Sequence, residues 1–111
     1  MAKLVIVESP FAGEVEKNIA YARACLRDCF QKGEYPLASH LLYTQPGILN
    51  DQDSTERSLG IAAGLAWGEF AEATVVYTDL GISAGMQVGI NTAKKCGRRV
   101  EYRKINWTPI K

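Results

Sequence analysis

The sequence has no long apolar run, no excess of charge of one sign, and few histidines and cysteines. Its longest apolar segments, such as LVIV and TVVY, are far too short to span a bilayer. The net charge of +1 gives no electrostatic basis for binding nucleic acid or an anionic membrane. No apolar signal region with a cleavage site precedes the first apolar strand pattern. We therefore expect a cytoplasmic protein that binds neither nucleic acid nor membrane.

The usual metal, redox and phosphate-binding motifs are also absent. There is one histidine, no CxxC pair and no GK[ST] of a P-loop. Cys25 and Cys29 are four residues apart in a helical pattern and therefore share a face, which suits either a metal or redox pair or two small core residues. We favour the core, because free cysteine is commonly buried. No metal and no cofactor are expected.

What remains is the composition of an ordinary globular domain. Of the 111 residues, 47% are hydrophobic and 23% are charged, which fits one compact domain over residues 1–111. The apolar run at 3–8 and the short segments at 35–39, 73–79 and 99–104 predict strands. Helical periodicity at 14–31, 54–70 and 83–96 predicts helices between them, with Gly33 and Gly97 as the stops after the first and the third, and a long connection at 40–53 contains a Pro-Gly turn.

Alternating strands and helices predict an α/β fold with a parallel sheet. We expect a flavodoxin/Rossmann-like three-layer sandwich with four to five parallel strands. In such sheets the ligand lies beyond the carboxyl ends of the strands, where the strand order reverses. If the strands at 3–8 and 73–79 are neighbours there, the loops that follow them face one crevice. The candidate ligand-binding residues are Glu8, Ser9, Pro10, Phe11, Gly13, His40, Tyr43, Asp79, Gly81, Ser83, Gly85 and Met86.

Several of these side chains suit more than one role. Glu8 and Asp79 can accept hydrogen bonds from ribose hydroxyls, form an acid/base pair, or merely cap the turns that follow their strands. His40 is a candidate acid/base or stacking ring, or a loop histidine bonded to the backbone. Phe11 and Tyr43 suit either stacking on a base or packing. Glu8 favours function, because it ends an apolar strand where the site is expected, and an acid there needs partners.

The helix predicted from Ser83 offers an anion-binding terminus. The first N–H groups of a helix are free and lie at the positive end of its dipole, which favours phosphate or carboxylate. Ser83 adds a hydroxyl, although the same residue is also an ordinary N-cap.

The helix at 54–70 carries glycine every fourth residue, at Gly60, Gly64 and Gly68. Each glycine weakens the helix relative to alanine but permits close approach of another backbone. The helix therefore lies tightly on the sheet, on another subunit or near the ligand, and we favour packing. Its further apolar residues predict a homodimer or larger oligomer, with this helix and the 40–53 loop near the interface.

The chain resembles the nucleoside 2-deoxyribosyltransferase-like superfamily, which includes deoxynucleoside monophosphate N-glycosidases. It is most similar to small relatives that are often carried by bacteriophages. The resemblance extends from LVIVESPFAG to TVVYTDLGISAGMQVG. It implies that the loop in ESPFAG holds a sugar and that Asp79 is the acid ending the third strand. It also implies that Ser83 and Gly85 open the next helix. The cytoplasm is then that of the host if a phage encodes the protein.

Two acidic residues of that superfamily are missing from this sequence. The family has a glutamate four residues after the glycine of Ser-x-Gly, and that glutamate is its nucleophile; here the position is Gly89. A second family acid lies on the preceding helix, but residues 61–68 contain none. Glycine cannot replace a carboxylate nucleophile. We therefore expect binding of a nucleoside or nucleotide derivative, as sensor or sequestering protein, without N-glycosidic cleavage. The alternative is an active N-glycosidase or deoxyribosyltransferase with relocated acids, Glu8 and Asp79 first. A third possibility is an interaction module with a vestigial pocket.

Overall fold

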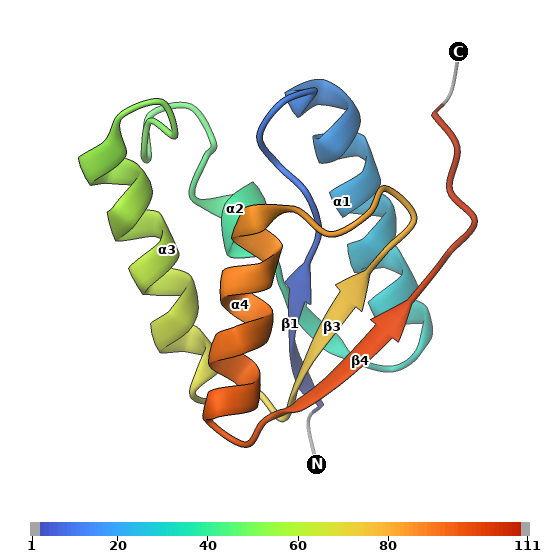
Figure 1. Ribbon diagram of the computed structural model, residues 1–111. Helices are drawn as coiled ribbons and strands as arrows, with labels where there is room; N and C mark the ends of the chain where they lie inside the picture. Colours follow the sequence, from blue (N-terminus) through green and yellow to red (C-terminus); the bar gives the residue numbers. More distant parts are fainter. Residues whose placement is uncertain (1–2, 110–111) are drawn as a thin grey trace.

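The computed structural model describes residues 3–109 (Figure 1). Within these residues the chain forms one parallel sheet with helices on both sides. The strands are β1 (Leu4–Glu8), β2 (Tyr35–Leu37), β3 (Ala73–Tyr77) and β4 (Arg99–Arg103), and the helices are α1 (Val15–Gln31), α2 (Ser39–Leu42), α3 (Ser54–Gly68) and α4 (Ala84–Lys95). The predicted three-layer α/β fold is confirmed, with the lower of the two expected strand numbers.

The strand order is β2-β1-β3-β4, and each neighbouring pair is parallel. The chain runs from β1 outward to β2, then returns across β1 to β3. The order therefore reverses between β1 and β3, which are hydrogen-bonded neighbours, so the condition set in the sequence analysis is met. The loops that leave these two strands open the crevice where ligands bind in sheets of this kind.

Alternation along the strands divides the core between the two faces of the sheet. One face packs against α1 through Val5, Val7, Val75, Tyr77, Tyr21, Cys25 and Cys29. The other face packs against α4 through Val76, Met86 and Ile90. Figure 1 shows α1 on one side of the sheet and α3 and α4 on the other. The two cysteines are fully buried in the α1 layer, as their interpretation as core residues predicted.

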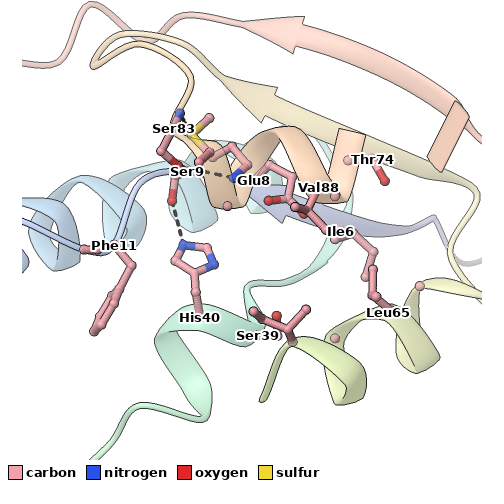
Figure 2. Close-up of a pocket in the computed structure, with 18 of the residues that line it drawn as sticks. Ile6, Glu8, Ser9, Phe11, Ser39, His40, Leu65, Thr74, Ser83 and Val88 are labelled. Atoms are coloured by element: carbon pink, nitrogen blue, oxygen red, sulfur yellow. Dashed lines mark hydrogen bonds between the residues drawn. The ribbon is translucent and has the colours of Figure 1, made fainter. Parts of the chain in front are cut away.

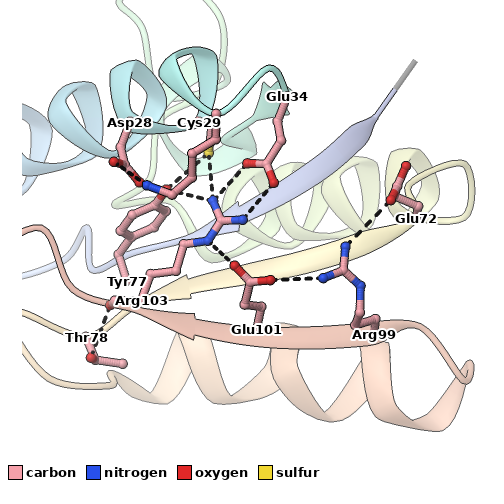
Figure 3. Close-up of polar contacts among 10 residues, drawn as sticks. Asp28, Cys29, Glu34, Glu72, Tyr77, Thr78, Arg99, Glu101 and Arg103 are labelled. Carbon is pink, nitrogen blue, oxygen red and sulfur yellow. Dashed lines mark hydrogen bonds and ion pairs between the residues drawn. The ribbon is translucent and has the colours of Figure 1, made fainter. Parts of the chain in front are cut away.

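A buried ion pair joins the end of β4 to the loop after α1 (Figure 3). The Arg103 guanidinium donates to both carboxylate oxygens of Glu34 at 2.8 and 2.7 Å, and both side chains are almost completely buried. Arg103 also donates to the Tyr77 hydroxyl, which in turn donates to Asp28 at 2.7 Å. Since every charge in this network has a partner, we assign it a structural role in fastening α1 to the sheet.

The connection after β2 differs from the prediction. The strand expected over 35–39 ends at Leu37, and Ser39 begins the one-turn helix α2, so His40 is helical rather than in a loop. Polar side chains after the turn bond to its carbonyl groups: the Thr44 hydroxyl donates to His40 O at 2.6 Å and the Gln45 amide donates to Leu41 O at 3.0 Å. These hydrogen bonds satisfy carbonyls that a single helical turn cannot satisfy by itself.

The predicted helix stops at Gly33 and Gly97 are confirmed. Both residues have positive φ, at 75° and 73°, directly after α1 and α4. Glycine adopts this conformation without the strain that a Cβ would introduce. Within residues 3–109, no helix combines the length and the apolarity that crossing a bilayer requires.

The glycine stripe of α3 packs inside the chain. A Cβ on Gly64 would lie 2.9 Å from Cβ of Ser39 in α2, and one on Gly68 would lie 3.1 Å from the Arg98 guanidinium. The glycines therefore let α3 approach α2 and Arg98, which agrees with the packing role that we favoured. The helix has little contact with the sheet itself, and a cavity separates the two.

Candidate functional site

The cavity lies between α3, α4 and the sheet, and its volume is about 250 Å³. It opens at the carboxyl end of β1 and extends beneath α3 toward the start of β3. Seven of the predicted residues line it: Glu8, Ser9, Phe11, His40, Ser83, Gly85 and Met86. They come from the end of β1 and the loop after it, from α2, and from the start of α4; Figure 2 labels Glu8, Ser9, Phe11, His40 and Ser83 among them. The fold therefore brings together three segments that are far apart in the chain.

Glu8 lines the cavity, and its carboxyl group lies against α4. Alternation along β1 turns its side chain to the same face as Ile6, away from α1. The carboxyl lies directly against the backbone of α4, where a Cβ built on Gly89 would be 2.5 Å from its Cδ. Gly89 is therefore needed to make room for Glu8. The acid of β1 occupies the space into which a side chain at position 89 would project.

The surroundings of Glu8 favour its neutral form. Burial raises the pKa of the carboxyl from its ordinary value of 4.5 to about 8, against the opposing attraction of the Arg98 guanidinium. The carboxyl makes no hydrogen bond to any other residue in the described part of the chain. At neutral pH it is largely protonated, so it can donate one hydrogen bond and accept others. A carboxyl without a protein partner on the wall of a cavity is available to a ligand.

Arg98 closes the inner end of the cavity. Its guanidinium donates to Thr74 Oγ1 at 3.1 Å and to the carbonyl oxygen of Gly68. These hydrogen bonds join α3 to β3 across the gap between them. Sequence reasoning missed both Arg98 and Thr74, because they lie at the amino ends of β4 and β3, whereas ligand sites in parallel sheets are expected at the carboxyl ends. Gly68 was the only available signal, since its missing side chain makes room for the guanidinium.

His40 and Ser9 form a polar pair on the opposite wall. The Ser9 hydroxyl lies 2.8 Å from His40 Nε2, so one of the two groups donates to the other. Burial lowers the pKa of His40 to about 4, which keeps the imidazole neutral at physiological pH. The Phe11 ring lies edge-on to the imidazole with centroids 6.5 Å apart. The pair therefore offers a neutral hydrogen-bonding group beside an aromatic surface.

The start of α4 forms the rim of the cavity. Ser83 is the N-cap, as predicted, and its hydroxyl accepts a hydrogen bond from the Met86 N–H at 3.2 Å. Ala84 and Gly85, whose N–H groups belong to the first turn of the helix, also line the cavity. Free N–H groups and the positive end of the helix dipole favour an anion at this position.

Asp79 lies elsewhere and has other partners. Its carboxylate accepts from the Tyr21 hydroxyl at 2.7 Å and from the N–H groups of Ile105 and Trp107 at 3.0 and 3.2 Å. Burial opposes ionisation, but these hydrogen bonds hold the pKa of Asp79 below its usual range. Asp79 therefore anchors the segment after β4 against α1, and it is not among the residues that line the cavity.

The remaining candidates lie around the cavity rather than in it. Tyr43 lines a small depression on the outer side of His40, and Gly13 lines a shallow one beyond Phe11. Pro10 is buried in the loop after β1, and Gly81 has a positive φ of 86° in the turn before α4. None of these four residues lines the cavity itself. Ile6, Ser39, Asp51, Arg57, Ile61, Leu65 and Val88 also line the cavity and were not predicted.

Comparison with known proteins gives a family without a stated activity. The chain belongs to the family described as a domain of unknown function (DUF7768), whose model matches residues 3–103. No curated protein matches it. The match spans all four strands and all four helices of the described residues, together with the whole cavity.

Proposed function

We propose that the protein binds a nucleoside or nucleotide derivative in this cavity without cleaving its N-glycosidic bond. The observation that carries the proposal is the Glu8 carboxyl, which lies half-buried on the cavity wall at the carboxyl end of β1 and makes no hydrogen bond to another residue among residues 3–109. A ligand hydroxyl that replaces water at this carboxyl would give it a hydrogen-bonding partner. The sugar of a nucleoside presents hydroxyls of this kind.

The other walls of the cavity suit the remaining parts of such a ligand. The first turn of α4 with Ser83 offers an anion site for a phosphate. Phe11 and the neutral His40 offer an aromatic and hydrogen-bonding surface for a base. The resemblance to the nucleoside 2-deoxyribosyltransferase-like superfamily supports the same ligand class. It further suggests a protein that senses or sequesters its ligand in the cytoplasm, that of the host if a bacteriophage encodes it.

Retained ligand is the most direct test of binding. Native mass spectrometry of protein purified from cells should detect a bound nucleotide-like molecule, and calorimetry with nucleosides and nucleotides should identify its class. Ser83→Glu places a negative charge where we place the phosphate and should weaken nucleotide binding severely. Gln87→Glu adds the same charge at an exposed position of α4 outside the cavity and serves as the matched control. Equal affinity of both variants for nucleotides would rule out this phosphate position.

One observation supports a second candidate function. In the superfamily that the chain resembles, the nucleophile occupies the position of Gly89, and here the Glu8 carboxyl lies against that glycine. A carboxyl with a pKa of about 8 suits a general acid at neutral pH. Glu8 would then act on the glycosidic bond from β1 instead of from α4.

Release of free base distinguishes the two functions. The wild type should be incubated with deoxynucleosides, their monophosphates and cyclic nucleotides, and free base followed by chromatography. Binding with every ligand recovered intact supports the binding protein. Base release that Glu8→Gln abolishes and Asp79→Asn does not would establish an enzyme that uses Glu8. A fold check by circular dichroism should accompany both variants.

A further inference from the structure

The outward side of α3 is apolar along most of its length. Residues 58–68 contain no charged side chain, and Gly68 is the only buried residue of the helix. A helix on the surface of a soluble domain usually carries charged residues on its outer side. This one presents Leu59, Ala63 and Ala66 at steps of four and three residues, which is the spacing of a helix–helix contact, and Phe70 follows in the turn just after the helix ends at Gly68.

This stripe is distinct from the glycine stripe and from the wall of the cavity. Gly64 and Gly68 face α2 and Arg98, and both line the cavity together with Ile61 and Leu65. Leu59 and Phe70 are 57% and 72% exposed, so nothing in the described chain covers them. Figure 1 shows α3 at the outer edge of the molecule, with no further element beyond it.

The apolar surface continues from the end of α3 onto the edge of the sheet. Trp67 and Phe70 line a groove of about 310 Å³ together with Leu4, Tyr35 and Leu42. Pro36 lies in the middle of the short edge strand β2, and proline cannot donate a ladder hydrogen bond. Pro36 therefore disfavours the addition of a further strand at this edge, which leaves the exposed side chains as its contact surface. We call the stripe on α3 and this groove the α3 face.

The size of the α3 face matches one side of a stable dimer. The rings of Tyr35, Trp67 and Phe70 are 57–72% exposed. With roughly 100–150 Å² still open on each of these aromatic side chains, and the exposed leucines and alanines beside them, the face offers about 700–800 Å². A standard interface buries about 800 Å² on each partner, whereas isolated apolar patches on monomers rarely exceed a few hundred.

We propose that a second copy of this chain covers the α3 face, in an isologous dimer built on α3. The face is self-complementary, because its row of alanines is a shallow floor that can accept the bulky Trp67 and Phe70 of the partner across a two-fold axis. The partner would also support the wall of the ligand cavity, since α3 is held mainly by α2 and Arg98 and has little contact with the sheet.

The test places a charge in the centre of the α3 face. Ala66 is exposed, so Ala66→Glu fits the isolated chain, but in the dimer it would bury a carboxylate on each side. Ala20→Glu is the matched control, because Ala20 is an exposed alanine in α1 on the opposite side of the sheet. We expect light scattering to show dimers for the wild type and for Ala20→Glu at micromolar concentration. Ala66→Glu should be monomeric, with dimerisation weakened at least about a hundredfold.

Fluorescence of Trp67 gives a second readout on the same surface. In a Trp107→Phe background Trp67 is the sole tryptophan, and the dimer should protect it from acrylamide quenching. Adding Ala66→Glu should restore quenching while the far-ultraviolet circular dichroism stays unchanged. A monomeric wild type with quenchable Trp67 would overturn the proposal and leave the face to a different protein. An oligomer that Ala66→Glu does not affect would overturn it as well.

Discussion

Replacement of Glu8 by glutamine should change how stability depends on pH. Burial raises the pKa of Glu8 from 4.5 to about 8 in the folded protein, while the unfolded chain keeps the ordinary value. Between these two pH values the folded state holds a proton that the unfolded state has lost. The free energy of unfolding of the wild type therefore falls as pH rises from about 4.5 to about 8, and it levels off above that.

The size of the effect follows from the difference between the two pKa values. At about 1.4 kcal/mol for each tenfold change in proton affinity, the full difference corresponds to roughly 5 kcal/mol. Solvent that reaches the carboxyl through the mouth of the cavity screens part of this, so we expect a loss of about 2–4 kcal/mol. Glutamine has nearly the same shape but no proton to lose, so the Glu8→Gln variant lacks this contribution.

Urea denaturation of both proteins from pH 5 to pH 9 measures the difference directly. His40, Asp28 and Asp79 contribute equally to the pH dependence of stability in both proteins, so their contributions cancel in the difference between the two. Between pH 5 and pH 9 the wild type should lose stability that Glu8→Gln keeps. The free energy of unfolding of Glu8→Gln should therefore rise relative to that of the wild type by the amount that the wild type loses. Glu16→Gln, which removes an exposed carboxyl from α1, is the control and should follow the wild type. Parallel pH dependences for the wild type and Glu8→Gln would refute the raised pKa and the availability of this proton to a ligand.

Four further outcomes follow from the same contacts. His40, the only histidine, should show neutral imidazole resonances from pH 8 down to pH 5, since burial lowers its pKa to about 4; an NMR midpoint near 6.5 would contradict its burial. Gly89→Ala should cost about 1–3 kcal/mol in chemical denaturation through its clash with Glu8 and become neutral or stabilising in a Glu8→Ala background; equal costs in both backgrounds would exclude the clash. Asp79→Ala should cost about 2–3 kcal/mol by freeing the segment after β4, and nucleotide affinity measured by calorimetry should not change. Arg103→Met leaves a buried carboxylate unpaired and should cost about 3–5 kcal/mol, seen as a lower denaturation midpoint.

The sequence alone determined the features that depend on local chemistry. Strands and helices were readable from periodicity, the helix stops from Gly33 and Gly97, and the helix start from Ser83. The alternation of elements implied the parallel sheet and placed the loops of β1 and β3 at one edge. Each of these inferences rests on neighbours in the chain or on a rule of topology, so no side-chain packing had to be known. The sequence did not predict the one-turn helix α2, because the hydrogen bonds to its carbonyl groups come from side chains in the following loop.

Only the tertiary structure decided which acid faces the cavity. In the sequence Glu8 and Asp79 were both candidates for the site, and Glu8 was favoured only by its place at the end of an apolar strand. Both faces of β1 are covered, so its uniform apolar pattern does not reveal to which side Glu8 points, and Asp79 lies beyond the last residue of β3, where strand alternation no longer applies. The fold places Glu8 against a glycine 81 positions later in the chain and Asp79 against backbone N–H groups after β4. Contacts between such distant residues depend on how α3 and α4 lie over the sheet, which local sequence does not specify.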